Sequence, residues 1–349
     1  MLKTILFTHD DLDGAGCRIV YELAHHHLEK GKDYMVFNCP NNGADNAVMD
    51  CIEKGLIDKN TEICFGDIVA SRETLEHLVN NYSMPKIWDH HRTNFFTTWV
   101  VPEAVIVPEN DFGVMQSGTS LMYQHFSLVN ELNVKNEKLL DKLIDTIRSY
   151  DTFEWKETNN LDAKKLNILF SLLGMEVFCN EYIARVNSDD TSDDIITDGD
   201  IKFVNAKIDY EQRIIDGVTP DDVYRVSVNG LKTAFILGGM GVNVSELAHQ
   251  FLTKYPDDFD MFASFNLWRG GEFQFRTIKD DLDIGKDVAA LIGGGGHPKA
   301  AGAPLGDEIR HELLKLLIMK MNAPADVDIL KQPVDELAAP LQILVANAK

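Results

Sequence analysis

The chain has 349 residues, 45% of them hydrophobic and 25% charged, which is the composition of a globular protein with one large or two medium domains. Its formal net charge of −22, without a basic stripe, argues against a protein that grips long nucleic acid through many phosphates. We expect no signal peptide and no membrane span, and five scattered cysteines without a CxxC spacing predict reduced thiols in a cytoplasmic protein.

The N-terminal part of the chain alternates short apolar runs with amphipathic segments. Such alternation predicts an α/β fold, with a parallel sheet in the N-terminal domain and helices on both of its faces. Ligands of these sheets lie at the carboxyl ends of the strands. The expected strands are 3–8, 34–38, 62–67 and 86–89, and the expected helices run from Gly14 to about Lys30, from 46 to 54 and from 72 to 80.

The remainder of the chain predicts helices first and a smaller α/β domain second. We expect helices at 117–132 and about 137–150, then an acidic break at Asp189–Asp200 and a connecting helix that ends at Gly217. The second domain shows strands near 224–228, 233–237, 261–267 and 272–277, a helix near 245–255 and a glycine-rich segment at 293–302. The predicted bounds are 1–188 for the first domain, with a helical portion at 117–188, 189–217 for the linker and connecting helix, 218–325 for the second domain and 326–349 for a tail without an assigned role.

Carboxylates and histidines follow three of the predicted strands. His9, Asp11 and Asp13 are spaced i, i+2 and i+4 after the first strand, so on extended backbone their side chains would converge on one side. Gly14 would then let the chain turn tightly into the helix. Asp67 closes another strand, and the sequence Asp89-His90-His91 closes a further one, while Asp151 follows a helix.

Each of these residues has an ordinary structural interpretation. Asp67 could be a turn carboxylate, Asp13-Gly14 a turn dipeptide and Asp151 a helix cap. Their joint placement at the ends of successive strands favours a metal site instead. Carboxylates and imidazoles without a thiolate suit Mn²⁺ first, then Mg²⁺, Co²⁺ or Fe²⁺. Two such ions, roughly 3.5–4 Å apart, can acidify a bridging water and stabilise charge on an attacked phosphorus.

The second domain supplies candidate phosphate contacts. Four glycines precede His297 and give a backbone that can approach a ligand closely, with Gly295 and Gly296 nearest to the histidine. His297 can donate to a phosphate, and Arg276 can do so bidentately. The alternative is that the glycine run is merely a loose loop. Weaker candidates for substrate contact are Asn243, Ser245 and Lys299.

The ordered motifs resemble a known family, the DHH phosphoesterases. The motifs that carry the resemblance are Thr8-His9-Asp10-Asp11-Leu12-Asp13-Gly14, Gly66-Asp67, Asp89-His90-His91 and Tyr150-Asp151, followed by Gly293 to Gly302, which is similar to the GGGH signature of the DHH-associated C-terminal domain. They cover the chain to about residue 305. The stretches Tyr150 to Trp155 and Ser117 to Ser120 resemble the nanoRNase, or oligoribonuclease (NrnB-like), branch.

The resemblance implies a ligand set for two divalent ions, with Asp67 as the bridge. It implies His9 and Asp11 on one ion, and Asp13, His90 and Asp151 on the other. Many members place the first histidine where this chain has Phe7, whereas His9 fits the spacing of RecJ-like proteins. The resemblance implies that His91 faces the substrate phosphate, that Asp67, His90 and His91 are catalytic, and that the second domain binds substrate.

The implied activity is that of a phosphoric diester hydrolase of the oligoribonuclease type. Such an exonuclease would cut short oligoribonucleotides (nanoRNA) to nucleoside monophosphates by a manganese-dependent two-metal mechanism. The expected partner is a short oligoribonucleotide or small nucleotide, with no long nucleic-acid duplex, and a homodimer is compatible with this. Alternatives are a phosphodiesterase for cyclic mono- or dinucleotides, an inorganic pyrophosphatase and an inactive nucleotide sensor.

Overall fold

The computed structural model describes residues 2–40, 43–238, 241–266 and 271–306, together with His311 and Lys315. The chain divides into two compact units, Met1–Asn205 and Ala206–Lys349, which are described one at a time. The division falls within helix α9 (Asp198–Gly217). The domain bounds expected from the sequence stay predictions, and the tail at 326–349 lies outside the described residues.

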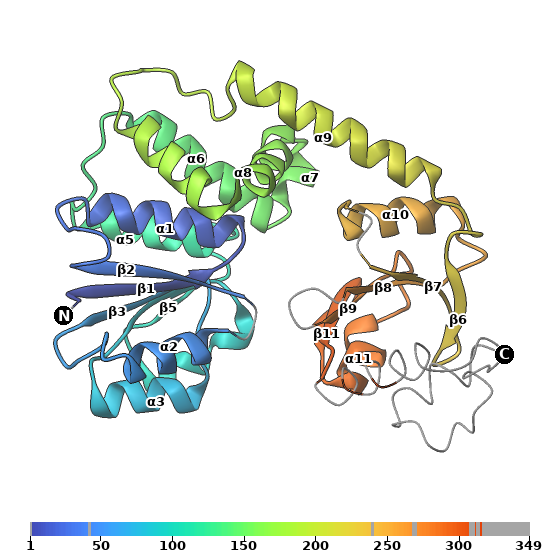
Figure 1. Cartoon of the computed structure of the whole chain (residues 1–349), viewed down its shortest axis with the longest axis horizontal. Helices are drawn as coiled ribbons and strands as arrows, with labels where there is room; N and C mark the ends of the chain where they lie inside the picture. The colour runs from blue at the N-terminus through green and yellow to red at the C-terminus, as the bar shows by residue number, and fades with distance from the viewer. Residues whose placement is uncertain are drawn as a thin grey trace. The chain divides into compact units, whose positions relative to one another are not determined.

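Unit 1 is built on a five-stranded parallel sheet, and this confirms the predicted α/β class. The strand order is β2-β1-β3-β4-β5, so the first strand lies inside the sheet. Because these strands are parallel, the carboxyl ends of β1, β3 and β4 meet at one edge. Figure 1 shows β1 between β2 and β3. The strands are β1 (Thr4–His9), β2 (Tyr34–Cys39), β3 (Glu62–Gly66), β4 (Lys86–Asp89) and β5 (Val105–Ile106).

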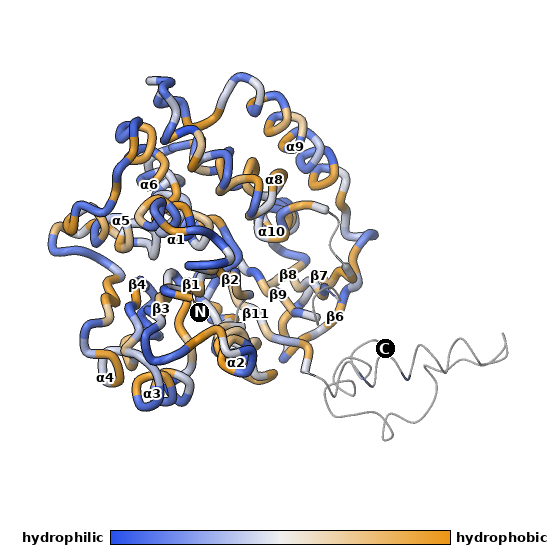
Figure 2. Tube along the Cα trace, turned by 60° about the vertical axis from the view of Figure 1, so that its left-hand side comes forward, coloured by the Kyte–Doolittle hydropathy of each residue, from blue (hydrophilic) through white to orange (hydrophobic). Residues whose placement is uncertain are grey.

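Helices cover both faces of this sheet, as predicted. Leu6 of β1 packs into the core under α1, α5, α6 and α8, while Ile5 and Phe7 pack into the core under α2 and α3. In Figure 2, apolar and polar residues alternate around the turns of covering helices such as α3 and α6. The helices are α1 (Leu12–Ala24), α2 (Ala44–Glu53), α3 (Arg72–Asn81), η1 (Arg92–Asn94), α4 (Thr97–Val100), α5 (Gly118–Leu128), α6 (Glu137–Asp151), α7 (Glu154–Thr158) and α8 (Leu161–Val186).

Two helices end earlier than predicted. Helix α1 ends at Ala24 instead of continuing to Lys30. The Nδ1 of His26 donates to the carbonyl of Leu23 at 3.0 Å and so satisfies an acceptor that a further turn would have used. Helix α5 ends at Leu128 instead of 132, because the chain turns through a left-handed residue at Asn130 (φ 54°).

Helix α8 is long and apolar enough, by length and composition alone, to cross a membrane, and the sequence had led us to expect no such segment. Its most apolar window is 33% buried. Phe178, Cys179 and Tyr182 lie fully inside the core of unit 1, and the helix is broken at Gly174, whose φ of 73° and ψ of 166° are not helical. A core helix of a globular domain meets the same criteria. All five cysteines are buried free thiols, as predicted.

Unit 2 contains a six-stranded mixed sheet in the order β10-β11-β9-β8-β7-β6. Apolar clusters cover its two faces, one beneath α10 and the other beneath α11 and η3. The elements are β6 (Tyr224–Val228), β7 (Leu231–Leu237), α10 (Val244–Lys254), β8 (Met261–Asn266), β9 (Glu272–Arg276), α11 (Ile284–Asp287), η3 (Ala289–Ile292), β10 (Gly295–His297) and β11 (Ala300–Pro304).

Part of the glycine-rich segment forms a strand, β10, so the alternative of a merely loose loop does not hold for these residues. The strand pairs with β11 in an antiparallel hairpin. A Cβ on Gly294 would lie 2.1 Å from the carbonyl oxygen of Gly302, and a Cβ on Gly296 would lie 2.6 Å from that of Ala300. These two glycines therefore permit close packing of the hairpin.

Candidate active site

The first group of predicted ligands lies at the ends of β1 and β3. His9, Asp11 and Asp67 bring one ligand atom each to within 4.8 Å of one another. The Nδ1 of His9 lies 2.7 Å from Oδ2 of Asp11 and 3.8 Å from Oδ2 of Asp67. The group therefore offers one nitrogen and two carboxylate oxygens to a common point.

A second group lies beside the first. Asp13, His90 and Asp151 also bring their ligand atoms to within 4.8 Å of one another. The Nε2 of His90 lies 3.2 Å from Oδ2 of Asp151 and 3.4 Å from Oδ1 of Asp67. Asp67 thus directs one carboxylate oxygen to His9 and the other to His90, so its carboxylate lies between the two groups.

The route of the chain through His9 and Asp13 differs from the prediction. The strand stops at His9, and Asp11 is the N-cap of α1, where its side chain accepts the N–H of Gly14 at 3.0 Å. Extended backbone does not continue to Asp13, so His9 and Asp11 fall in one group and Asp13 in the other. Gly14 lies inside the helix. A Cβ there would meet the carbonyl oxygen of His9 at 2.0 Å, so glycine permits a close approach and does not form a turn.

The carboxylate of Asp13 is held by the N-terminus of α5. Its Oδ2 accepts the N–H of Gly118 at 2.7 Å and its Oδ1 accepts the N–H of Thr119 at 3.1 Å. The Thr119 hydroxyl donates to the main-chain oxygen of Asp13 at 2.6 Å. Ser117 caps the same helix through its side chain. The Ser117–Ser120 stretch thus has a positioning role that we had not inferred from the sequence.

Asp67 has an unusual backbone conformation. Its φ of 59° lies in the left-handed region, which costs energy for a residue other than glycine, although aspartate and asparagine tolerate it better than most. Its N–H donates to the carbonyl of Trp88 at 3.0 Å. A Cβ on Gly118 would lie 2.6 Å from the Cβ of Asp67, so α5 can approach this residue only because position 118 is glycine.

Asp89 orients the two histidines that follow it. Its Oδ1 accepts the N–H of His90 at 2.8 Å, the N–H of His91 at 3.2 Å and the Nδ1–H of His91 at 2.7 Å, while its Oδ2 accepts Nδ2 of Asn94 at 2.5 Å. Burial alone would raise the pKa of Asp89, but the hydrogen bond and charge of His91 hold that pKa below its usual range. No sequence pattern had singled out Asn94, because its contact depends on the fold of η1.

The buried donor atoms of the cluster fit a divalent cation. Among the described residues, Oδ1 of Asp67, Nε2 of His90 and Oδ2 of Asp151 are buried without a hydrogen-bond partner. Burial, together with the charges of Asp13 and Asp11, raises the pKa values of Asp67 and Asp151 well above the ordinary carboxyl range. Buried carboxylates without partners are costly unless a cation neutralises them. Oxygen and imidazole donors without a thiolate suit hard or borderline divalent ions.

In unit 2, Arg276 and His297 occupy the same level of the sheet. His297 pairs with Ala300 across β10 and β11, and Ala300 pairs with Arg276 across β11 and β9. Directly paired residues project from the same face, so a small alanine separates the side chains of Arg276 and His297. The Nε of Arg276 donates to the Ser245 hydroxyl at 3.0 Å, and its Nη1 donates to main-chain carbonyls.

The weaker candidates of unit 2 have structural roles of their own. The side chain of Asn243 caps α10 by accepting two backbone N–H groups. Ser245 accepts from Arg276, as described above, and Nζ of Lys299 lies 2.8 Å from Oδ1 of Asp280. A Cβ on Gly295 would have no neighbour within 4 Å among the described residues, so this glycine leaves open space beside His297.

Comparisons with known proteins identify the family. Oligoribonuclease NrnB of Bacillus subtilis (strain 168) is 30% identical to the chain over 315 residues, which are 87% of this chain and 73% of that protein. The chain belongs to the DHH phosphoesterase family. It lies in the NrnB-like branch that the motifs predicted, and its activity is that of a phosphodiesterase of the nuclease class. No family model matches the chain.

Solved structures of the same fold include two DHH proteins. RecJ of Thermus thermophilus, in complex with Mn²⁺, has a TM-score of 0.52 and 14% identity, over 92% of this chain and 52% of that one. The DHH domain of a protein from a family of ribosomal proteins has a TM-score of 0.52 and 14% identity, over 92% of this chain and 86% of that one. At these identities the likeness shows the fold of a DHH phosphoesterase.

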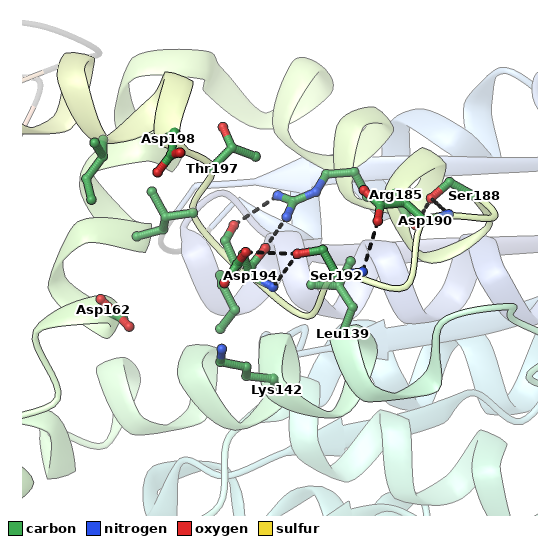
Figure 3. Close-up of a pocket in the computed structure, with 13 residues that line it drawn as sticks. Leu139, Lys142, Asp162, Arg185, Ser188, Asp190, Ser192, Asp194, Thr197 and Asp198 are labelled. Atoms are coloured by element: carbon green, nitrogen blue, oxygen red, sulfur yellow. Dashed lines mark hydrogen bonds between the residues drawn. The ribbon is translucent and has the colours of Figure 1, made fainter.

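A cavity elsewhere in unit 1 lies apart from the DHH motifs. It has a volume of about 500 Å³, and its lining comes from residues between Leu139 and Ile201 (Figure 3). None of the predicted site residues lines it. Figure 3 shows Arg185 beside Asp194, and its guanidinium donates to the main-chain oxygens of Asp194 and Ile195, so it holds the chain that borders the cavity.

Proposed function

We propose that this DHH phosphoesterase hydrolyses the terminal phosphodiester of short oligoribonucleotides and releases nucleoside monophosphates, with two divalent ions, Mn²⁺ foremost. The observation that carries the metal site is the position of Asp67, whose two oxygens face two separate groups of ligands. The substrate class is supported by the NrnB relative, which is named an oligoribonuclease. The net charge of −22 favours a small substrate over a long polyanion.

The two groups support this set of ligands. His9 and Asp11 would hold one ion, while Asp13, His90 and Asp151 would hold the other, and Asp67 would contact both. Ions bound there would supply Lewis-acid stabilisation of charge on the phosphate and would lower the pKa of water. The hydrogen bonds from Gly118 and Thr119 fix the carboxylate of Asp13, so this ligand is held in place before any substrate arrives.

His91 is suited to contact the substrate phosphate. Its side chain is 50% exposed, whereas that of His90 is 14% exposed. Burial lowers the pKa of His91, but the hydrogen bond to Asp89 and the charge of Asp89 outweigh it, so the pKa is raised overall. With Nδ1–H donated to Asp89, a protonated His91 presents Nε2–H as the donor to a phosphate oxygen.

The phosphate contacts of unit 2 are Arg276 and His297, beside Gly295 and Gly296. Desolvation lowers the pKa of Arg276, but a guanidinium stays charged at neutral pH. The guanidinium of Arg276 and the imidazole of His297 lie on one face of the sheet, separated by Ala300, and can both donate to one anionic group. A cytoplasmic location and a homodimer stay predictions from the sequence.

The test is product analysis with the whole chain, after chelation and readdition of Mn²⁺. End-labelled linear dinucleotides and longer RNAs, a cyclic dinucleotide and inorganic pyrophosphate are compared, with Asp67→Asn as the inactive control. We expect monophosphates from the linear dinucleotide at the highest rate, and only with metal. A higher rate on the cyclic dinucleotide, phosphate release from pyrophosphate as the main reaction, or binding without turnover would each overturn the proposal.

A further inference from the structure

An exposed aromatic side chain follows the ligand Asp151 directly. Helix α6 ends at Asp151, Thr152 is its C-cap, and Phe153 precedes α7. The Phe153 residue is 61% exposed, and its φ of 61° is left-handed. A left-handed residue often follows the C-cap of a helix, but glycine usually occupies that position. A bulky residue there is strained, and such strain gathers at functional sites.

The residues around Phe153 form an aromatic layer with a cation. Trp155 stacks on Tyr150 with ring centroids 6.0 Å apart and planes 13° apart, and the Tyr150 hydroxyl accepts Nδ2 of Asn167 at 2.8 Å. The Nζ of Lys156 lies 5.2 Å from the ring centroid of Phe153 and 5.6 Å from that of Trp155. The segment thus joins a supported pair of rings, an exposed ring and a positive charge in an acidic protein.

Packing does not account for the placement of Phe153. Its ring is mostly in solvent, so burial does not offset the strain of its backbone. Within the described residues, Nε1 of Trp155 is buried without a hydrogen-bond partner, so this aromatic layer also contains an unsatisfied donor. Because Phe153 is only two residues after Asp151, their Cα atoms lie within about 7 Å of each other. This is close enough for a base whose phosphate lies at the carboxylate cluster.

We propose that Phe153 is a stacking platform for the nucleobase next to the phosphodiester that is cut, with Lys156 providing positive charge beside it. This rests on the proposed oligoribonuclease function and adds a positioning residue to it. Stacking on an aromatic ring tolerates any base, because every base has a π-face. The platform therefore selects for a nucleotide that carries a base, and not for a particular sequence.

The kinetic test compares Phe153→Leu, which keeps an apolar side chain, with Phe153→Trp, which keeps an aromatic one. Phe203→Leu is the matched control, because Phe203 lies on α9 and is 69% exposed. Each protein is assayed on a dinucleotide and on the same dinucleotide with one base removed. We expect Phe153→Leu to raise KM for the intact dinucleotide about tenfold, in line with base–aromatic stacking energies. Its KM for the abasic compound should be unchanged, and Phe153→Trp should restore binding.

A binding experiment separates this proposal from the proposed function. A non-hydrolysable dinucleotide containing 2-aminopurine is titrated into each protein with Mn²⁺, since stacking quenches its fluorescence. Quenching by the wild type and Phe153→Trp, but not by Phe153→Leu, supports the platform. Equal quenching by Phe153→Leu, or none by the wild type, overturns it. A wild type that quenches but never cleaves RNA overturns the proposed function and leaves the platform in place.

Discussion

The Nε2 atom of His90 lies 3.2 Å from Oδ2 of Asp151, and neither atom forms a hydrogen bond with any part of the chain that the structure describes. Burial lowers the pKa of His90, which favours the neutral ring with a lone pair available for an ion. The same burial raises the pKa of Asp151. Two such atoms, held side by side without partners, would be stabilised by a shared cation.

Asp67→Asn is predicted to abolish hydrolysis and to stabilise the metal-free protein. The substitution removes one of several crowded carboxylates, and asparagine accepts the left-handed backbone of position 67. Each kcal/mol of relieved repulsion raises Tm by about 2–4 °C in a unit of this size. Calorimetry in chelator would show the increase, and added Mn²⁺ would stabilise the wild type far more than the variant. A metal-free variant that melts below the wild type would contradict the repulsion.

His90→Ala and His91→Ala are predicted to differ although the residues are adjacent. His91→Ala should lower kcat about 10²–10³-fold, which is typical for the loss of one donor to a charged transition state, and leave Mn²⁺ affinity unchanged. His90→Ala should weaken Mn²⁺ binding as well. Metal affinity is measured by electron paramagnetic resonance of free Mn²⁺. Equal loss of affinity in both variants would show that His91 is also a ligand.

His297→Ala is predicted to raise KM while leaving folding intact. The His297 side chain is exposed on β10, and loss of one hydrogen bond to a phosphate costs about 1.5–3 kcal/mol, or roughly 10- to 100-fold in affinity. Lys299→Ala is the matched control, because Lys299 is paired with Asp280. Steady-state kinetics on a dinucleotide would show a larger KM for His297→Ala alone. Similar kinetics for both variants would remove His297 from the site.

His25 is predicted to make unit 1 less stable below neutral pH. Burial lowers the pKa of His25 from its ordinary value of 6.5, although the charges of Glu62 and Glu131 oppose this. The unfolded chain therefore takes up a proton near pH 6.5 that the folded protein resists, so stability falls as the pH falls from that value towards the folded pKa. Urea unfolding at about pH 7.5 and about pH 5.5, on either side of this titration, should show a larger loss for the wild type than for His25→Gln. Equal losses would mean that His25 does not contribute.

The sequence predicted those features that follow from periodicity and strand order. The ends of β1, β3 and β4 carry His9, Asp67 and Asp89 as expected, because the carboxyl ends of parallel strands share one edge. The pattern after β1 did not show that Asp11 and Asp13 belong to different groups of ligands. Their spacing fits extended backbone and a helix start equally well, and hydrogen bonds from Gly118 and Thr119, 105 and 106 residues away in sequence, hold Asp13.

Features without a local signal could not be predicted. Phenylalanine rarely adopts a left-handed backbone, so the sequence around Phe153 gave no reason to predict one there. The glycines before His297 have low strand propensity, yet pairing with β11 makes β10 a strand. In both places the tertiary environment overrides the intrinsic conformational preference of the residues.

The most direct test of the central claim is anomalous diffraction from crystals of the wild-type protein soaked in Mn²⁺. We predict two anomalous peaks roughly 3.5–4 Å apart, the spacing of two-metal sites. Both peaks should contact Asp67, one beside His9 and Asp11 and the other beside His90 and Asp151. A single peak, or peaks that do not share Asp67, would contradict the two-metal account.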